Sequence, residues 1–311
     1  MSMLPYKLLD WIDQDKLSWV YLCRNTHAGQ LLEKNTDKID WENLSSNSSP
    51  RAIRILEKNL DKVDWSYLSF NPGAVDILKK NKDKINWAEL AGNPDPRAIE
   101  LLEHYHPYKP IYTRLVWDSL SENPCALHLL EQNPDKIDWH EISENPSAIH
   151  LIEQNLLHSL HSDKIDWFGL SVNPAAIPIL EKNIDKIKWA ALHFNQNPKA
   201  IQLLEKNPDK IDWSDISFHP HAIPLLENLL HTLHSDKIDW KSLSNNSAAI
   251  HLLEKNIDKI DWQNLSLNPS IFVYDYDEMK KNKGELHEEL LAMMLSPDNV
   301  SNFEGWGLCR I

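Results

Sequence analysis

The sequence predicts an all-α fold, a right-handed α-solenoid of about eleven two-helix repeats of about 22 residues, with a cap at each end. The first observation is the phrase WDSLSENPCALHLLEQNPDKID, which runs from Trp117 to Asp138 and recurs along most of the chain. The second is that seven glycines in 311 residues are few for a fold rich in β-turns. The third is that most of the thirteen tryptophans open such a unit, namely Trp19, Trp41, Trp65, Trp87, Trp117, Trp139, Trp167, Trp189, Trp213 and Trp240.

The longer helix of each unit begins at an Asn-Pro pair. In the unit that starts at Trp117, the Asn123 side chain can cap free amides, and Pro124 gives up an amide that would have no partner. The apolar residues that follow are spaced by three and four and therefore share one face. This pattern predicts a helix over 124–132, with Asn133 in the left-handed conformation that often ends a helix.

A second, shorter element begins at Asp138. The residues Asp138 to Glu141, DWHE, resemble a capping box with aspartate in the cap position, and the next Asn-Pro pair ends the run. A helix of about a turn and a half, α or 3₁₀, is therefore expected. Isolated helices shorter than about 12–15 residues are marginal in water, so these units must stack on one another to be stable.

The predicted organisation has three parts. Residues 1–18 form an N-terminal cap, 19–270 the tandem helical repeats, and 271–311 a C-terminal helical cap over the open end of the stack. With about 8–10 Å between packed helices, the array would be a rod on the order of 100 Å long if it is not strongly curved.

Composition limits the partners. The formal net charge of −14 argues against binding a nucleic-acid backbone or an anionic membrane, so a protein partner is expected. The N-terminus does not resemble a signal peptide, and no apolar run approaches the roughly 18 residues of a membrane span. Cys23, Cys125 and Cys309 are far apart and without CxxC spacing, which indicates reduced thiols in an intracellular compartment.

The repeated phrase carries a resemblance. The pattern WxxLSxNPxAIxLLExNxDKIDW, followed by the tail YDYDEMK…EELLAMMLSP…GWG, resembles the uncharacterised tandem-repeat proteins of large DNA viruses of algae and amoebae. The resemblance implies a viral origin, a helical solenoid, and a location in the cytoplasm of the host cell or in the virion. It implies no activity. The unit is also similar in architecture to the leucine-rich variant repeats, which pair an α-helix with a 3₁₀-helix.

Two HxxH pairs are the candidate metal ligands. His158 with His161, and His231 with His234, place two imidazoles on one helical face, a spacing that suits zinc. A lengthened amphipathic helix explains the same residues, because no third ligand is placed nearby by the sequence. No P-loop, GxGxxG motif or catalytic triad pattern is present, so neither a cofactor nor an enzymatic activity is expected.

The exposed positions of the units vary, and partner specificity is expected there. Counted from each tryptophan, positions +1, +2 and +5 give the acidic residues Glu89, Asp118, Glu122, Glu141 and Glu144, and +5 gives Phe70, Phe194 and Phe218. These residues predict a surface for a basic and aromatic protein partner. The alternative is that the acids merely solvate an acidic protein and the phenylalanines are half-buried.

Three functions remain open from the sequence. The first is a non-catalytic protein-interaction scaffold that binds a host or viral protein along an extended solenoid surface. The second is a structural component of the virion, such as a minor capsid or cement-like protein. The third is a zinc-dependent helical protein that uses the HxxH pairs.

Overall fold

The computed structural model describes residues 4–105, 114–158, 163–230, 232 and 235–281. Within these ranges the chain is mostly helical, and the strands are limited to β1 (Tyr6–Leu8) and β2 (Phe272–Tyr274). The prediction of an all-α class is therefore confirmed.

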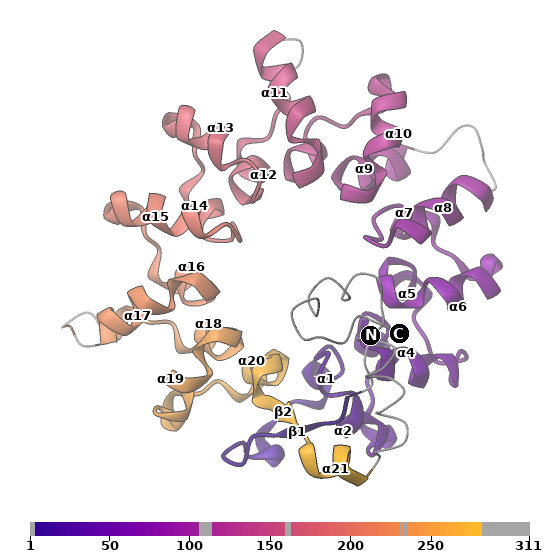
Figure 1. Cartoon of the computed structure of the whole chain (residues 1–311), viewed down its shortest axis with the longest axis vertical. Coiled ribbons are helices and arrows are strands. Elements are labelled where there is room, and N and C mark those ends of the chain that lie inside the picture. The colour runs from indigo at the N-terminus through magenta and orange to yellow at the C-terminus, as the bar shows by residue number, and fades with distance from the viewer. Residues whose placement is uncertain (1–3, 106–113, 159–162, 231, 233–234, 282–311) are drawn as a thin grey trace, which may run out of the picture.

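The helices are arranged in pairs around a ring (Figure 1). Those that contain or directly follow the repeated tryptophans lie nearer its centre, and we call them the inner helices: α1 (Trp19–Leu22), α3 (Trp41–Ser45), α5 (Trp65–Phe70), α7 (Trp87–Ala91), α9 (Arg114–Glu122), the 3₁₀-helix η7 (Glu141–Glu144), α12 (Trp167–Val172), α14 (Trp189–Leu192), α16 (Trp213–Ser217), α18 (Trp240–Asn245) and α20 (Trp262–Leu267). The outer helices are α2 (Gly29–Glu33), α4 (Pro50–Glu57), α6 (Val75–Lys80), α8 (Pro96–Tyr105), α10 (Leu127–Gln132), α11 (Ile149–His158), α13 (Ile177–Lys182), α15 (Pro198–Lys206), α17 (Ile223–Leu230) and α19 (Ile250–Glu254). Helix α21 (Tyr276–Lys281) follows β2.

In the unit that starts at Trp117, the Asn-Pro corner starts the outer helix as the sequence predicts. Asn123 Oδ1 accepts a hydrogen bond from the Cys125 amide at 2.8 Å. A 3₁₀ turn, η5 (Pro124–Ala126), then leads into α10, so the two together cover the predicted range 124–132. Equivalent turns are η3 (Pro72–Ala74), η8 (Pro146–Ala148), η11 (Pro220–Ala222), η13 (Ser247–Ala249) and η15 (Pro269–Ile271).

The predicted left-handed end of this helix is wrong. Asn133 has φ −133° and ψ 61°, which is not the left-handed region. Its side-chain Nδ2 instead donates to the Leu129 carbonyl at 2.9 Å, an oxygen in the last turn that would otherwise lack a partner. The side-chain amide thus ends the helix without a positive φ.

The joints that follow the outer helices are short turns, most of them 3₁₀, and several of them place a lysine over a tryptophan. Asp64 caps α5 by accepting hydrogen bonds from the amides of Ser66 and Tyr67, both at 2.9 Å. In the same joint, Lys62 Nζ lies 4.7 Å from the ring centroid of Trp41, close enough for a cation–π contact. The joint turns are η1 (Gln14–Lys16), η2 (Thr36–Lys38), η4 (Lys82–Lys84), η6 (Pro134–Lys136), η9 (Ile184–Lys186), η10 (Pro208–Lys210), η12 (Ser235–Lys237) and η14 (Ile257–Lys259).

Buried asparagines connect each unit to the one before it. Asn145 Nδ2 donates to the backbone oxygens of Ser121 at 2.9 Å and Asn123 at 3.1 Å. We call the set of equivalent residues the asparagine ladder, and one of its positions is a histidine: Asn25, Asn47, Asn71, Asn93, Asn123, Asn145, Asn173, Asn195, His219, Asn246 and Asn268. Buried carbonyls need partners, so each unit depends on its neighbour for hydrogen bonding as well as for packing.

A second ladder runs through the serines at position +4. Ser121 Oγ donates to the Trp117 carbonyl at 2.8 Å and accepts from the Asp138 amide of the next unit at 3.0 Å. The hydroxyl therefore links the end of one inner helix to the start of the next.

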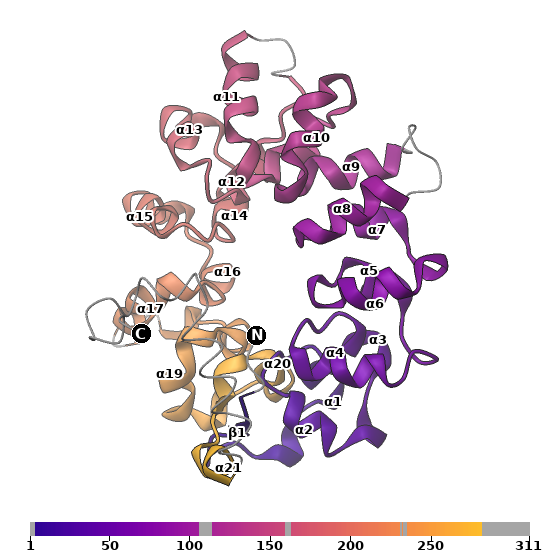
Figure 2. The ribbon, with the colours of Figure 1, turned by 45° about the vertical axis from the view of Figure 1, so that its right-hand side comes forward.

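The first and last units are joined by the same bonds. Asn25 Nδ2 donates to the carbonyls of Ser266 and Asn268, and the Ser18 amide donates to Ser266 Oγ at 2.8 Å. Strand β1 pairs antiparallel with β2, and Tyr6 lies opposite Tyr274. A rod was expected only for a weakly curved array, and that condition is not met, because the first unit binds the last and the helix pairs close into a ring (Figures 1 and 2). The segments expected to cover opposite ends contact each other instead.

Candidate functional site

The inner helices present exposed aromatic side chains. Phe70 ends α5, Phe194 follows α14 and Phe218 follows α16, and these side chains are 50%, 41% and 39% exposed. Tyr67 on α5 and Phe168 on α12 are exposed to a similar degree and were missed from the sequence. They occupy positions +2 and +1, where only acidic residues were singled out, so the same positional rule would have found them. We call these five residues the rim aromatics.

Three of the predicted acidic residues lie together, and we call them the acidic triad: Glu122 at the end of α9, with Glu141 and Glu144 on η7. The pKa of Glu122 is raised, first by partial burial and then by the like charges of Glu144 and Glu141. The pKa of Glu144 is raised by partial burial and by the charges of Glu141 and Asp166, against a smaller lowering by His140. The ionised triad is therefore a site of like-charge repulsion, only partly offset by His140, that a cation would stabilise.

The other two predicted acids have different surroundings. Asp118 lies on α9 within 3.8 Å of Arg114, a pair one helical turn apart. Glu89 lies on α7, the preceding inner helix, and is exposed. The charges that raise the pKa of Glu122 are those of Glu144 and Glu141. Asp118 and Glu89 are not among them, so we do not count these two residues in the triad.

Side chains at position +5 extend onto the next unit. A Cβ added at Gly169 on α12 would lie 2.8 Å from Glu144 Cγ, and one added at Gly92 would lie 3.0 Å from the Phe70 ring. The missing side chains at these two glycines thus allow Glu144 and Phe70 to lie close against the neighbouring backbone. At these two joints, an exposed side chain of one unit therefore lies against the backbone of the next.

We predict that removing one charge from the acidic triad stabilises the protein at neutral pH. The raised pKa of Glu144 means that the folded state favours the protonated form, so this contribution is present below about pH 4.5 and is lost as the pH rises through the folded-state pKa. Glu144→Gln is expected to raise the melting temperature by about 1–2 °C at pH 7 and not at pH 4, since the group is largely exposed. Glu205→Gln on α15 is the control, and an equal gain there would contradict the prediction.

The candidate zinc ligands fall largely outside the described residues. His158 ends α11 and is exposed, whereas His161, His231 and His234 are not among the residues that the structure describes. In the described ranges, no group of three His, Cys, Asp or Glu residues has an arrangement that could hold a metal ion.

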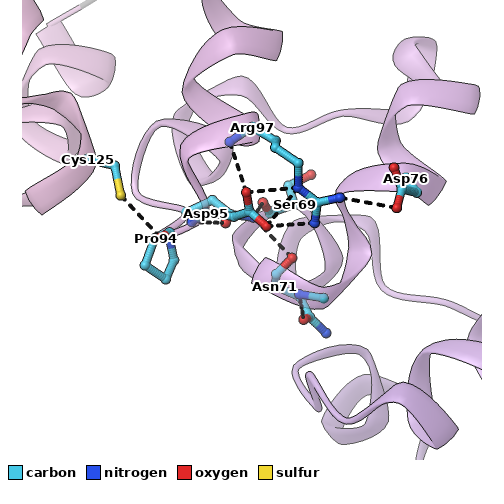
Figure 3. A network of polar contacts seen from close by, with 9 residues as sticks. Ser69, Asn71, Asp76, Pro94, Asp95, Arg97 and Cys125 are labelled. Carbon is cyan, nitrogen blue, oxygen red and sulfur yellow. Dashed lines mark hydrogen bonds and ion pairs between the residues drawn. The ribbon is translucent and has the colours of Figure 1, made fainter. Parts of the chain in front are cut away.

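A groove crosses the corners of three units, and Figure 3 shows the polar network beside it. It has a volume of about 460 Å³ and is lined in part by Ile53, Gly73, Asp95 and Arg97. Arg97 binds Asp95 through Nη2 at 2.7 Å and reaches Asp76 through Nη1 at 3.3 Å, which lowers the pKa of Asp95. Both nearby carboxylates therefore hold the guanidinium, and it is not available to an anionic ligand.

Two cysteines lie in the described part of the chain, and both are free thiols. Cys23 replaces a serine of the second ladder and accepts from the Asp40 amide at 3.3 Å; burial is the main cause that raises its pKa to about 11. Cys125 Sγ donates to the Pro94 carbonyl at 3.2 Å (Figure 3). These thiols have structural partners, while Cys309 lies outside the described residues.

Comparison with known proteins found no matching family model, no matching curated protein and no matching solved structure. Among the described residues, no helix has both the length and the apolar character needed to cross a membrane. The fold and the surface together define a ring of helix pairs with acidic and aromatic residues on its inner helices.

Proposed function

We propose that this protein is a non-catalytic interaction scaffold: a right-handed α-solenoid of about eleven repeats, closed into a ring, that binds a protein partner on its inner helices. The observation that carries the proposal is the presence of the rim aromatics and the acidic triad on one continuous set of helices. Aromatic side chains are enriched at protein interfaces, and clustered exposed apolar residues mark binding surfaces.

The partner that fits this surface is a basic segment with apolar or aromatic side chains. Burial and like-charge repulsion raise the pKa of Glu122 and Glu144, and lysine or arginine placed at the triad would relieve the repulsion. The net charge of −14 would also steer a cationic segment toward the ring, which predicts binding that weakens with salt. The rim aromatics would supply the apolar contacts, including contacts with guanidinium groups.

The binding experiment uses a fluorescently labelled synthetic peptide of alternating arginine and tryptophan, followed by anisotropy. Replacing the triad by Glu122→Gln, Glu141→Gln and Glu144→Gln is expected to weaken binding at least tenfold, about 1.4 kcal/mol. Replacing Phe70 and Phe218 by serine is expected to have a similar effect at high salt, where the electrostatic attraction is screened.

A control variant removes the same charge from the outer helices. Glu131→Gln, Glu181→Gln and Glu205→Gln match the triad variant in net charge, and all three side chains are exposed. The proposal requires this control to bind within about twofold of the wild type, by the steep distance dependence of screened charges. Equal weakening by both variants would show a general attraction to an acidic protein and would reject the inner helices as the site.

The resemblance to viral repeat proteins extends this proposal to a host or viral partner in the cytoplasm of an infected cell. The virion component is the alternative. The scaffold is favoured because the ends of the array contact each other and are not offered for stacking onto coat proteins. Stoichiometric amounts of the protein in purified particles would favour the alternative, and its absence from them would favour the scaffold.

A further inference from the structure

Histidine replaces both ladder residues at one joint of the ring, between the units that begin at Trp189 and Trp213. His193 takes the serine position, and its Nε2 accepts from the Asp212 amide at 2.9 Å. His219 takes the asparagine position, where its Nε2 lies 2.8 Å from the Asn195 carbonyl and its Nδ1 accepts from the His221 amide at 3.1 Å. Its ring nitrogens thus reproduce the donor and the acceptor of an asparagine side chain.

These bonds constrain the protonation state of both rings. An imidazole nitrogen accepts a hydrogen bond only when it carries no proton. His193 must therefore be neutral with its proton on Nδ1, and His219 must be neutral with its proton on Nε2. The serines and asparagines of the other joints make the same contacts with groups that do not titrate, as Ser121 and Asn145 do.

The surroundings oppose a positive charge at this joint. His193 and His219 are each 1% exposed, and His193 Nδ1 is buried without a hydrogen-bond partner among the described residues. The pKa of His219 is lowered mainly by burial and further by His221 and His193, while its bond to the Asn195 carbonyl raises it. The Asp212 carboxylate is a titratable group at the start of α16. It accepts hydrogen bonds from the Ser214 and Asp215 amides, so it caps this helix.

We propose that this joint is an acid-sensitive hinge of the ring. Protonation of the ring nitrogens that now accept would remove these acceptors and place donors against the Asp212 and His221 amides. Helix α14 has just four residues, Trp189–Leu192, so its packing surface against α16 is short. The hydrogen bonds of His193 and His219 therefore make a large part of the contact between these two units. The other joints keep their bonds at the same pH, so the ring loosens at this position.

The direction of the pH dependence follows from the neutral rings. The pKa of His219 is lowered in the folded state, so its contribution to stability is complete above the ordinary pKa of about 6.5 and is lost as the pH falls toward the lower pKa of the folded state. The acidic triad changes the stability at lower pH, where carboxylates titrate, so its pH dependence can be separated from that of the histidines.

Hydrogen exchange of the full chain tests the hinge amide by amide. Between pH 7 and pH 5, the Asp212 and His221 amides are expected to lose at least tenfold in protection after correction for intrinsic rates, while the Asp138 and Ser147 amides are not. The variant His193→Ser/His219→Asn restores the ladder residues and is expected to abolish this loss.

The control variant is His150→Gln/His251→Gln, which removes two half-exposed histidines of the outer helices that pair with Glu131 and Glu227. It should retain the acid-induced loss of protection at Asp212 and His221. His219→Asn alone should protect the His221 amide and not the Asp212 amide, which gives an independent readout if the double variant folds poorly. The proposal would be overturned if the protection of the Asp212 and His221 amides in the wild type did not change between the two pH values. The same loss of protection in the double variant would also overturn it.

Discussion

Replacing Asn145 by alanine is expected to destabilise the protein by about 2–5 kcal/mol, because the buried Ser121 carbonyl loses its donor and the Ser147 amide loses its acceptor, while the Asn123 carbonyl keeps only the Ala126 amide. The side chain is fully buried and donates to the Ser121 and Asn123 carbonyls of the preceding unit, while its Oδ1 accepts from the Ser147 amide. Urea denaturation followed by circular dichroism measures the change. Exchange of the Ser147 amide shows whether the loss is centred on this joint.

Asn133→Ala is the matched control. Asn133 makes a single side-chain bond, to the Leu129 carbonyl, at a half-buried helix end. Its loss is expected to cost about 0.5–1.5 kcal/mol, the net value of one hydrogen bond. Equal effects of the two variants would contradict the claim that the asparagine ladder carries a large part of the connection between units.

The local structure was predictable because each signal is complete within one unit. The Asn-Pro pair, the aspartate that precedes most of the repeated tryptophans and the three-and-four spacing each act over a few residues. The caps and helices that they predict occur in the structure at those positions. Asn133 shows the limit of such reasoning. A left-handed backbone and a side-chain cap are both compatible with asparagine at a helix end, and only the geometry distinguishes them.

Closure of the ring was not predictable from the repeated phrase. An array closes when the rotations between successive units sum to a full turn, and each rotation depends on packing angles that vary by about 15–20°. The sequence does contain a hint, because Asn25 occupies an asparagine-ladder position, and the other ladder residues donate to carbonyls of a preceding unit.

Part of the candidate site was predictable from the position of each residue within its unit. This position identified Glu122, Glu141 and Glu144. These three residues lie together because position +5 of one unit is near positions +2 and +5 of the next unit. Glu89 and Asp118 share these positions but differ in their neighbours. The roles of His193 and His219 were not predicted from the sequence. They become clear only from the hydrogen bonds between units that serine and asparagine make at the equivalent positions of other joints.

A disulfide across the seam of the ring is expected to form within one molecule and to stabilise it by about 5 kcal/mol, since it closes most of the chain into a loop. The Leu9 amide donates to the Ile271 carbonyl and the Asp275 amide to the Pro5 carbonyl. The Tyr6–Tyr274 pair therefore lies at a non-hydrogen-bonded position of the β1–β2 ladder, where Cα atoms are about 4.5 Å apart, within the range of a disulfide.

The variant Tyr6→Cys/Tyr274→Cys, in a background with Cys125→Ser and Cys309→Ser, tests this by mass spectrometry and non-reducing electrophoresis. When reduced, it should be less stable than the wild type by about 1–3 kcal/mol, because Tyr6 loses its stacking on His27 and Tyr274. Oxidation should convert it to a monomeric cross-linked species with a raised melting temperature. Tyr6→Cys/Phe218→Cys, with its second thiol on another unit of the ring, should not cross-link within one molecule. An open array would hold residues 6 and 274 at opposite ends, so cross-linking only between molecules would contradict the closed ring.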